Sequence, residues 1–388
     1  MACIIPALDY GSIAQSSIIV IHIAAALVLF LLLLQKYIDK DSLFVGVRIG
    51  KPAPALLFAI AASSFNSIYF FNTQLELQKI ITYIIIFIAT AAFFRTERRL
   101  KFLAYWIILC GTALAVIGIV KHLSGASFDK FWPRAEFATF ISRNSFDTYV
   151  SMALALSLAL IFCRIGPSAR TLTVPASFIM VAASMLTPDR GGWFGLIALA
   201  LFILALSGYE GMLKRKFWFV ALFLIFFLWI SALCVGLDKL IEKFIAVFVL
   251  NPKEAFLVDY DTTIWQRISV WKSSLEAAFN RPFLGVGLGN FRLAYPAFRG
   301  AEICNLVEYA HQDYLQFAVE AGIPALFSLI CLGFFFFKRM VTEVKFKQGS
   351  FLTGLKIGAL SGCFSMAFHC LYDFDFHIPS NAVLFMVL

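Results

Sequence analysis

The chain has 388 residues, of which 61% are hydrophobic and 14% charged, and its formal net charge is +9. A soluble protein carries about 25% charged residues, so this composition indicates an integral membrane protein. The basic residues are scattered through short loops rather than clustered, which speaks against nucleic acid as a partner. The eight cysteines include no CxxC spacing, and six fall in apolar runs, so neither a disulfide framework nor a zinc site is indicated.

Eleven apolar segments predict the transmembrane helices of a single polytopic domain over residues 1–388. The first is interpreted as a span because no basic stretch precedes it and no small-residue cleavage site follows it. In chain order the segments are 16–34, 54–71, 79–94, 102–120, 145–163, 171–187, 192–207, 217–236, 310–337, 351–371 and 380–388. We expect the ninth to kink at Pro324, because proline cannot donate to the carbonyl of Glu320.

The distribution of Lys and Arg predicts how the chain is oriented in the membrane. One set of short loops holds 17 basic residues and the opposite set holds 5. The richer set consists of 35–53, 95–101, 164–170, 208–216 and 338–348. By the positive-inside rule this set is cytoplasmic, which places the N-terminus and the remaining loops outside.

One outer connection, residues 237–309, is far longer than a usual loop, and long loops of this kind often carry function. Its stretch "TTIWQRISVWKSSLEAAF" places apolar side chains at helical spacing, at Ile264, Ile268, Trp271, Leu275 and Ala278. We therefore predict a helix lying at the membrane surface. Further along, "GVGLGN" (285–290) is similar to a phosphate loop, but no strand–turn–helix unit surrounds it, which favours tight turns instead.

Three polar residues at predicted outer ends of helices suggest a reaction. Arg190 lies in the hairpin "TPDRGGW", Arg267 on the surface helix, and His311 in "YAHQDYLQ" at the head of the ninth segment. Two arginine forks can bind a diphosphate and stabilise it as a leaving group. A neutral histidine can take a proton from an attacking hydroxyl, and a helix N-terminus would favour its neutral form. These three residues could catalyse glycosyl transfer from a lipid diphosphate with no metal ion and no other cofactor.

Each of these residues also has a simpler interpretation. Arg190 could anchor the chain at the interface, Arg267 could contact lipid headgroups, and His311 could be a satisfied polar contact. The hypothesis therefore requires that the three side chains converge on one outward-opening cavity, within about 10 Å of one another.

Four further residues are candidates for secondary roles at the same site. Asp313 and Tyr314 follow His311, while Asp373 and His377 belong to "DFDFHIP", where Asp375 and its neighbours could equally cap a turn. Glu320 lies about 13 Å along the helix from His311, too deep for direct chemistry.

The sequence resembles the O-antigen ligase and polymerase family of bacterial envelope glycosyltransferases. The resemblance rests on "DRGGW", "RISVWKSSLEAAFNRPFLGVGLGNF", "HQDYLQFAVEAGIPA" and "DFDFHIPSNAVLF" and covers roughly residues 140–388. It implies an all-α bundle of about a dozen spans with a large periplasmic loop, in the bacterial inner membrane. Two features depart from the family pattern: eleven segments are visible, and Pro-Asp precedes Arg190 where many relatives have Ser or Thr.

For function, the resemblance implies metal-independent, inverting transfer of a glycan from undecaprenyl diphosphate to lipid A–core on the periplasmic side. Arg190 and Arg267 would bind the diphosphate, and His311 would activate or position the acceptor hydroxyl. The same residues would serve a polymerase that joins lipid-linked repeat units, so that alternative stays open. Transfer to protein Ser or Thr is a third possibility. A transporter is disfavoured because the polar groups gather at the outer surface rather than near the midplane.

Overall fold

A computed structural model describes the chain over residues 15–39, 52–124, 135–161, 166–187, 190–208, 264–300, 303, 306–344 and 350–388. The described residues form helices and turns, and their only strand-type pairing is a bridge between Phe137 and Phe140. Seven of the described helices are long and apolar enough to cross a membrane. The predicted all-α polytopic membrane fold is confirmed.

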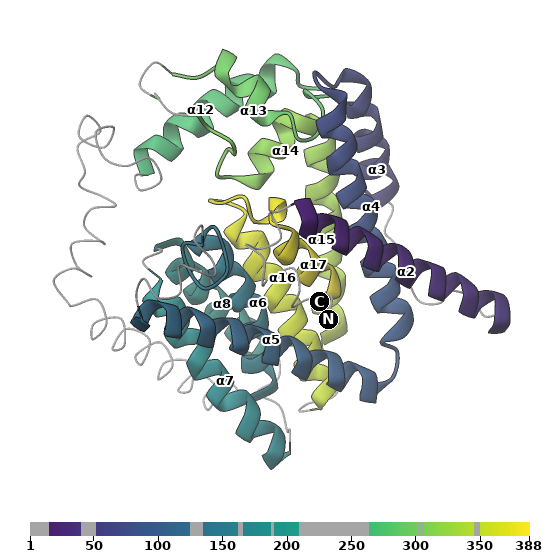
Figure 1. The fold of residues 1–388 in the computed structure, drawn as a ribbon, viewed down its shortest axis with the longest axis vertical. Coiled ribbons are helices and arrows are strands. Elements are labelled where there is room, and N and C mark those ends of the chain that lie inside the picture. The colour runs from purple at the N-terminus through teal and green to yellow at the C-terminus, as the bar shows by residue number, and fades with distance from the viewer. Residues whose placement is uncertain are drawn as a thin grey trace.

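The helices that exceed ten residues make up the body of the molecule (Figure 1). They are α2 (Gln15–Asp39), α3 (Pro52–Ser63), α4 (Phe70–Phe93), α5 (Glu97–Ser124), α6 (Arg143–Ile161), α7 (Pro167–Leu186), α8 (Arg190–Gly208), α12 (Ile264–Asn280), α15 (Ile323–Val344) and α16 (Phe351–His369). The shorter helices are η1 (Ser64–Asn66), α13 (Phe291–Ala294), η3 (Tyr295–Ala297), α14 (Asp313–Ala321), η4 (Asp375–His377) and α17 (Pro379–Val387).

Most predicted spans correspond to one helix, with two differences in the first hundred residues. The segment predicted at 54–71 is the short helix α3, which ends at Ser63. The next helix, α4, begins at Phe70 rather than near residue 79. The segment predicted at 217–236 lies outside the described residues.

Helix α6 is the centre of the bundle, because all its residues from Asn144 to Leu160 are buried. It packs most extensively against α16. A Cβ atom at Gly358 of α16 would lie 2.8 Å from Cα of Leu156, and one at Gly362 would lie 3.2 Å from the carbonyl oxygen of Met152. Glycines four residues apart let the two backbones approach closely, as small residues do between membrane helices.

The ninth predicted span is two helices rather than one kinked helix. Helix α14 ends at Ala321, and α15 begins at Ile323 after Gly322, whose φ of 87° lies in the left-handed region that favours glycine. The expected kink at Pro324 is therefore wrong, because this proline lies in the first turn of α15, where no helical partner is lost. The carbonyl of Glu320 instead accepts from Gly287 N at 2.9 Å.

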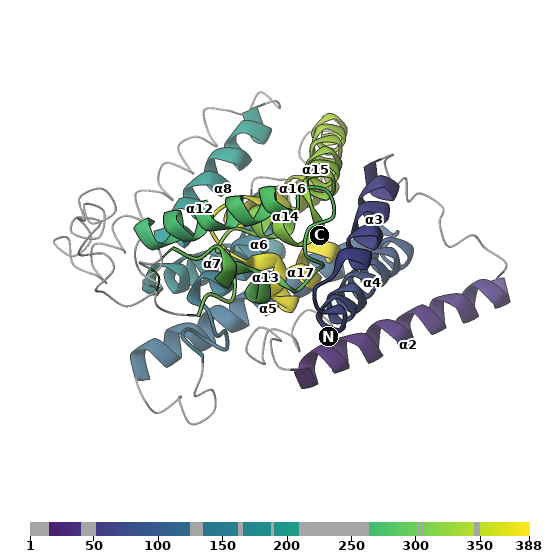
Figure 2. The ribbon, with the colours of Figure 1, turned by 90° about the horizontal axis from the view of Figure 1, so that it is seen from above.

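Helices α12, α13 and α14 gather at one end of the molecule and form what we call the α12–α14 cap (top of Figure 1). Seen from above, α12 and α14 lie across the bundle (Figure 2). The cap has a hydrophobic core of its own, separate from the core around α6. Val270 and Ala277 of α12 meet Val286 and Val319 there. The chain leaving α16 passes directly beneath the cap, which places the candidate residues together.

Candidate functional site

The segment 370–378, between α16 and α17, is where the predicted residues meet. Arg267 of α12 donates from Nη1 to the carbonyl of Tyr372 at 2.7 Å. The hydroxyl of Tyr372 donates to the carbonyl of Gly191 at 2.8 Å, next to Arg190 at the start of α8. The side chain of Arg190 lies outside the described part of the structure. Tyr372, through its carbonyl and its hydroxyl, thus joins the helices that carry the two predicted arginines.

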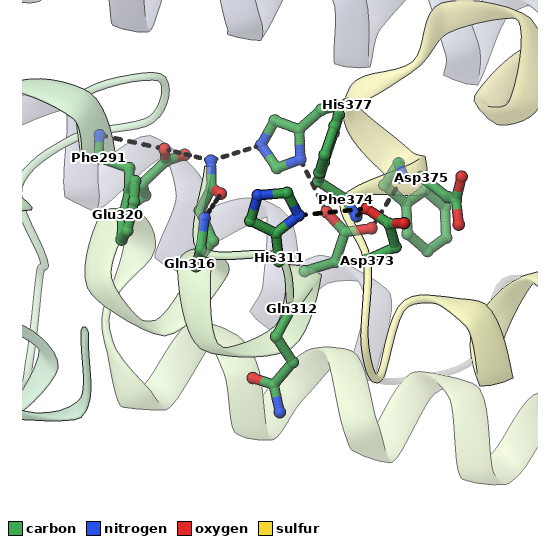
Figure 3. A network of polar contacts seen from close by, with 12 residues as sticks. Phe291, His311, Gln312, Gln316, Glu320, Asp373, Phe374, Asp375 and His377 are labelled. Atoms are coloured by element: carbon green, nitrogen blue, oxygen red, sulfur yellow. Dashed lines mark hydrogen bonds and ion pairs between the residues drawn. The ribbon is translucent and has the colours of Figure 1, made fainter. Parts of the chain in front are cut away.

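His311 reaches the same segment through its side chain. Its Nδ1 atom lies 3.7 Å from Oδ1 of Asp373, a distance suited to an ion pair (Figure 3). Its ring meets the ring of Phe374 edge-on, with centroids 5.2 Å apart. Its carbonyl accepts from Trp271 Nε1 at 3.3 Å. The structure therefore brings His311 and Arg267 to two consecutive residues, Asp373 and Tyr372.

His311 is not the first helical residue that the sequence suggested. Its φ of 49° is left-handed, and helix α14 begins two residues later at Asp313. Gln312 is the N-cap, and its side-chain oxygen accepts from Leu315 N at 3.0 Å. The expectation that His311 lies in the first turn is thus wrong, whereas an effect of the helix dipole on its side chain stays a prediction. The sequence does not reveal this turn, because the usual sign of a left-handed backbone is glycine, and residue 311 is a histidine.

Asp373 is a fully buried carboxylate between the two basic side chains. Burial alone would raise the pKa of Asp373, but His311, Arg267 and the amide of Asn144 lower it to about 2. Its Oδ1 atom also accepts from Phe374 N at 2.9 Å. Asp373 is therefore ionised at neutral pH, with its charge facing both the histidine and the arginine.

Asp375, two residues on, has the opposite character. Burial, and then the charge of Asp373, raise the pKa of Asp375 well above its ordinary value. Thr148 donates to Oδ2 at 2.8 Å and Asn381 donates to Oδ1 at 3.1 Å. The pKa values of the two aspartates thus shift in opposite directions, because Asp373 faces basic groups whereas Asp375 faces neutral donors and the charge of Asp373.

The start of α6 supplies site residues that sequence reasoning missed. Asn144 donates from Nδ2 to Oδ2 of Asp373. Asp147 is fully buried and accepts from the Thr187 hydroxyl at 2.5 Å, and a Cβ atom at Gly192 would lie 2.4 Å from it. The signal was present, because "RNSFDT" places polar residues at the head of an apolar run, as "YAHQDYLQ" does.

Asp313 and His377 form a second pair next to Asp373. The Nδ1 atom of His377 lies 2.7 Å from Oδ1 of Asp313, whose Oδ2 accepts from Phe376 N at 2.9 Å. Burial opposes charge on His377, but Asp313 outweighs it and raises the pKa of His377 to about 9. The side-chain amide nitrogen of Gln316 lies 3.0 Å from the other ring nitrogen of His377.

Tyr314, the remaining secondary candidate, faces away from these pairs. Its hydroxyl donates to the carbonyl of Ala367 in α16 at 2.8 Å. It therefore ties α14 to the bundle rather than lining the site.

The surface helix predicted in the long connection is confirmed as α12, but its buried side differs from the predicted one. Val270, Ala277 and Ala278 pack in the core of the cap, while Ile268 and Leu275 are exposed. The predicted apolar stripe therefore divides between the cap core and the surface. That the helix lies on a membrane stays a prediction.

The glycine-rich stretch 285–290 forms tight turns, as the sequence favoured. Its backbone surrounds a carboxylate of the chain itself: Gly289 N donates to Oε2 of Glu320 at 2.9 Å. Among the described residues, no group of three or more His, Cys, Asp or Glu is arranged to hold a metal ion.

Residues 175–330 match the family model described as O-antigen ligase. The matched range contains α8, α12 and α14, with Arg190, Arg267 and His311, whereas Asp373 lies beyond it. No curated protein matches the chain. The match indicates a glycosyltransferase-type membrane enzyme of O-antigen synthesis.

Proposed function

We propose that this chain, whose residues 175–330 match the O-antigen ligase family model, transfers a glycan from undecaprenyl diphosphate to the hydroxyl of an acceptor. The acceptor we favour is lipid A–core, on the periplasmic side of the bacterial inner membrane. The observation that carries the proposal is the buried Asp373 between His311 and Arg267, because it couples a candidate base to a candidate phosphate ligand.

In the proposed reaction the acceptor oxygen attacks the anomeric carbon of the glycan. The bond from that carbon to the diphosphate breaks, and undecaprenyl diphosphate leaves. His311 takes the proton of the acceptor hydroxyl, and the imidazolium that forms is stabilised by the Asp373 carboxylate. A single displacement of this kind inverts the anomeric configuration.

Arg267 and Arg190 would bind the leaving diphosphate. The bond from Arg267 to Tyr372 uses one of five guanidinium donors, and a planar fork suits phosphate oxygens. Arg190 begins α8, where helical N–H groups add a positive partial charge. Two arginines and a helix terminus would neutralise the charge that develops on the diphosphate, so we propose that the transfer needs no metal ion.

Polymerisation is the second candidate function, because the donor and the leaving group are the same. The two reactions differ only in the acceptor, which is either lipid A–core or a second lipid-linked glycan. Nothing in the described site favours transfer to protein or transport, and both become outcomes of the test.

The test uses the purified full chain in detergent with an undecaprenyl-diphosphate-linked glycan and a chelator. The donor is offered with lipid A–core or alone. We expect product on lipid A–core, lost in His311→Ala. Longer glycans on the lipid carrier would assign the polymerase reaction. If no product forms with either acceptor, the proposal is contradicted, and transfer to protein or transport becomes the better explanation. Full activity in His311→Ala would also contradict the proposal.

A further inference from the structure

Glu320 is a buried carboxylate that the proposed reaction does not use. It is 3% exposed and lies at the end of α14. Its Oε2 atom accepts from Gly289 N at 2.9 Å, and its Oε1 atom accepts from Phe291 N at 3.2 Å. Its carbonyl accepts from Gly287 N at 2.9 Å. One residue of α14 therefore accepts hydrogen bonds from three backbone N–H groups, two in the glycine-rich segment 285–290 and one in the residue that follows it.

Gln316, one turn earlier in α14, connects Glu320 to the candidate base. Its Nε2 atom donates to Oε1 of Glu320 at 3.1 Å, and its Oε1 atom accepts from Ala310 N at 2.9 Å. Ala310 directly precedes His311. The amide cannot be reversed, because its nitrogen would then face the Ala310 donor and its oxygen would face the carboxylate. Figure 3 shows the chain of contacts running from Phe291 through Glu320 and Gln316 to His377.

The position of His311 depends on these neighbours because its own backbone is unfavourable. A left-handed residue other than glycine costs roughly 1–2 kcal/mol, so surrounding contacts must hold it. On one side, Ala310 N is bound by Gln316. On the other side, Asp313 N donates to the carbonyls of Asp373 and Cys370 at 3.1 and 3.0 Å. The hydrogen bond from Ala310 N to Gln316 connects this turn, through Glu320, to the rest of the cap.

The same contacts fix the helix that carries Arg267. Helix α12 ends at Asn280, and the chain passes from it directly into the glycine-rich segment. That segment is fastened to α14 by the Glu320 bonds and by Val286 N, which donates to the carbonyl of Val319 at 3.0 Å. A shift of this segment along α14 would therefore move Arg267 relative to His311.

We propose that Gln316 and Glu320 are positioning residues that hold His311 and Arg267 in register across the α12–α14 cap. The inference rests on the proposed function, because it assigns these residues to the same transfer reaction. Neither residue touches the reacting atoms: Glu320 fastens the glycine-rich segment, and Gln316 passes that constraint to the turn containing His311.

Glu320→Gln tests the proposal with almost no change in shape. Every group that faces the carboxylate is a donor, so the new amide nitrogen must meet an N–H group of Gly289, Phe291 or Gln316. Glu308→Gln is the matched control, because Glu308 belongs to the same cap but is half-exposed and pairs with the half-exposed Arg292.

The readout separates positioning from loss of fold. Binding of undecaprenyl diphosphate to the purified chain gives the affinity and the number of sites per molecule, and the transfer assay gives kcat. We expect Glu320→Gln to lose at least tenfold in kcat with an unchanged number of sites per molecule, and Glu308→Gln to behave as the parent chain. An unchanged kcat would overturn the proposal, as would a loss of activity that matches a loss of binding sites.

A double variant identifies the residue through which Glu320 acts. If Glu320 acts by positioning His311, Glu320→Gln should lower the residual rate of His311→Ala by far less than it lowers the parent rate. Equal losses in both backgrounds would overturn the assignment to His311. Failure of the proposed function has a different signature, because His311→Ala itself would then keep the parent rate.

Discussion

The sharpest consequence of the site geometry concerns Asp373→Asn. The surroundings of Asp373 lower its pKa from 3.8 to about 2, so the folded protein favours the charged carboxylate by roughly 2 kcal/mol. Arg267 and His311 account for much of that preference. Arg267 and Asn144 share that preference with His311, so about thirtyfold, which corresponds to roughly 2 kcal/mol, is the most by which the neutral amide should slow transfer. We expect kcat to fall by between about threefold and thirtyfold, since Asp373 does not itself bind the diphosphate.

Asp375→Asn is the matched control for this prediction. Asp375 is equally buried and lies two residues away, and Asp375→Asn disturbs buried hydrogen bonds to Thr148 and Asn381 without touching either basic side chain. Initial rates over a range of donor concentrations should show a large loss of kcat in Asp373→Asn and a much smaller one in Asp375→Asn. A kcat within threefold of the parent for Asp373→Asn, or the reverse ranking of the two variants, would refute the reasoning.

Three further predictions follow from single contacts. Arg267→Lys should raise the donor KM about tenfold, because an ammonium lacks the planar fork; an unchanged KM would remove Arg267 from the diphosphate site. His377 has a pKa raised to about 9, so its contribution to stability is complete below its ordinary 6.5 and lost as pH rises through 9. The thermal unfolding midpoint of the parent chain should therefore fall between pH 7 and 10 more than that of His377→Gln, and parallel curves would contradict this. Gly289 has a φ of 72°, so Gly289→Ala should cost about 1–2 kcal/mol and lower the midpoint; an unchanged midpoint would show that the backbone there is not strained.

Hydropathy predicted the helices well because each span must satisfy its own backbone groups in lipid. The break at Gly322 was missed because its cause lies far along the chain. The carbonyl of Glu320 accepts from Gly287 N rather than from a residue of the helix, so this carbonyl keeps a hydrogen-bond partner at the break. A proline in an apolar run predicts a kink, but the sequence does not show that Gly287 binds the carbonyl released at the break.

The candidate site was predicted in part. His311 and Asp373 are predicted from their place at the ends of apolar runs and Arg267 from its place on the surface helix, and the structure brings them together around residues 372 and 373. Asn144 was missed, although the same argument applies to the head of α6. Its bond to Asp373 joins residues 229 positions apart, and no local pattern specifies such a pairing. The sequence places Glu320 too deep along the helix for direct chemistry. Its bonds to the glycine-rich segment could not be predicted, because they depend on how the long connection folds back.

The central claim is that arginine binds the diphosphate while histidine activates the acceptor, and one pair of variants tests it most directly. Undecaprenyl diphosphate binding and glycan transfer would be measured on the parent chain, Arg267→Ala and His311→Ala. The account predicts that Arg267→Ala weakens binding at least tenfold, whereas His311→Ala binds as the parent does and loses transfer. Parent-like binding by Arg267→Ala together with parent-like transfer by His311→Ala would contradict it.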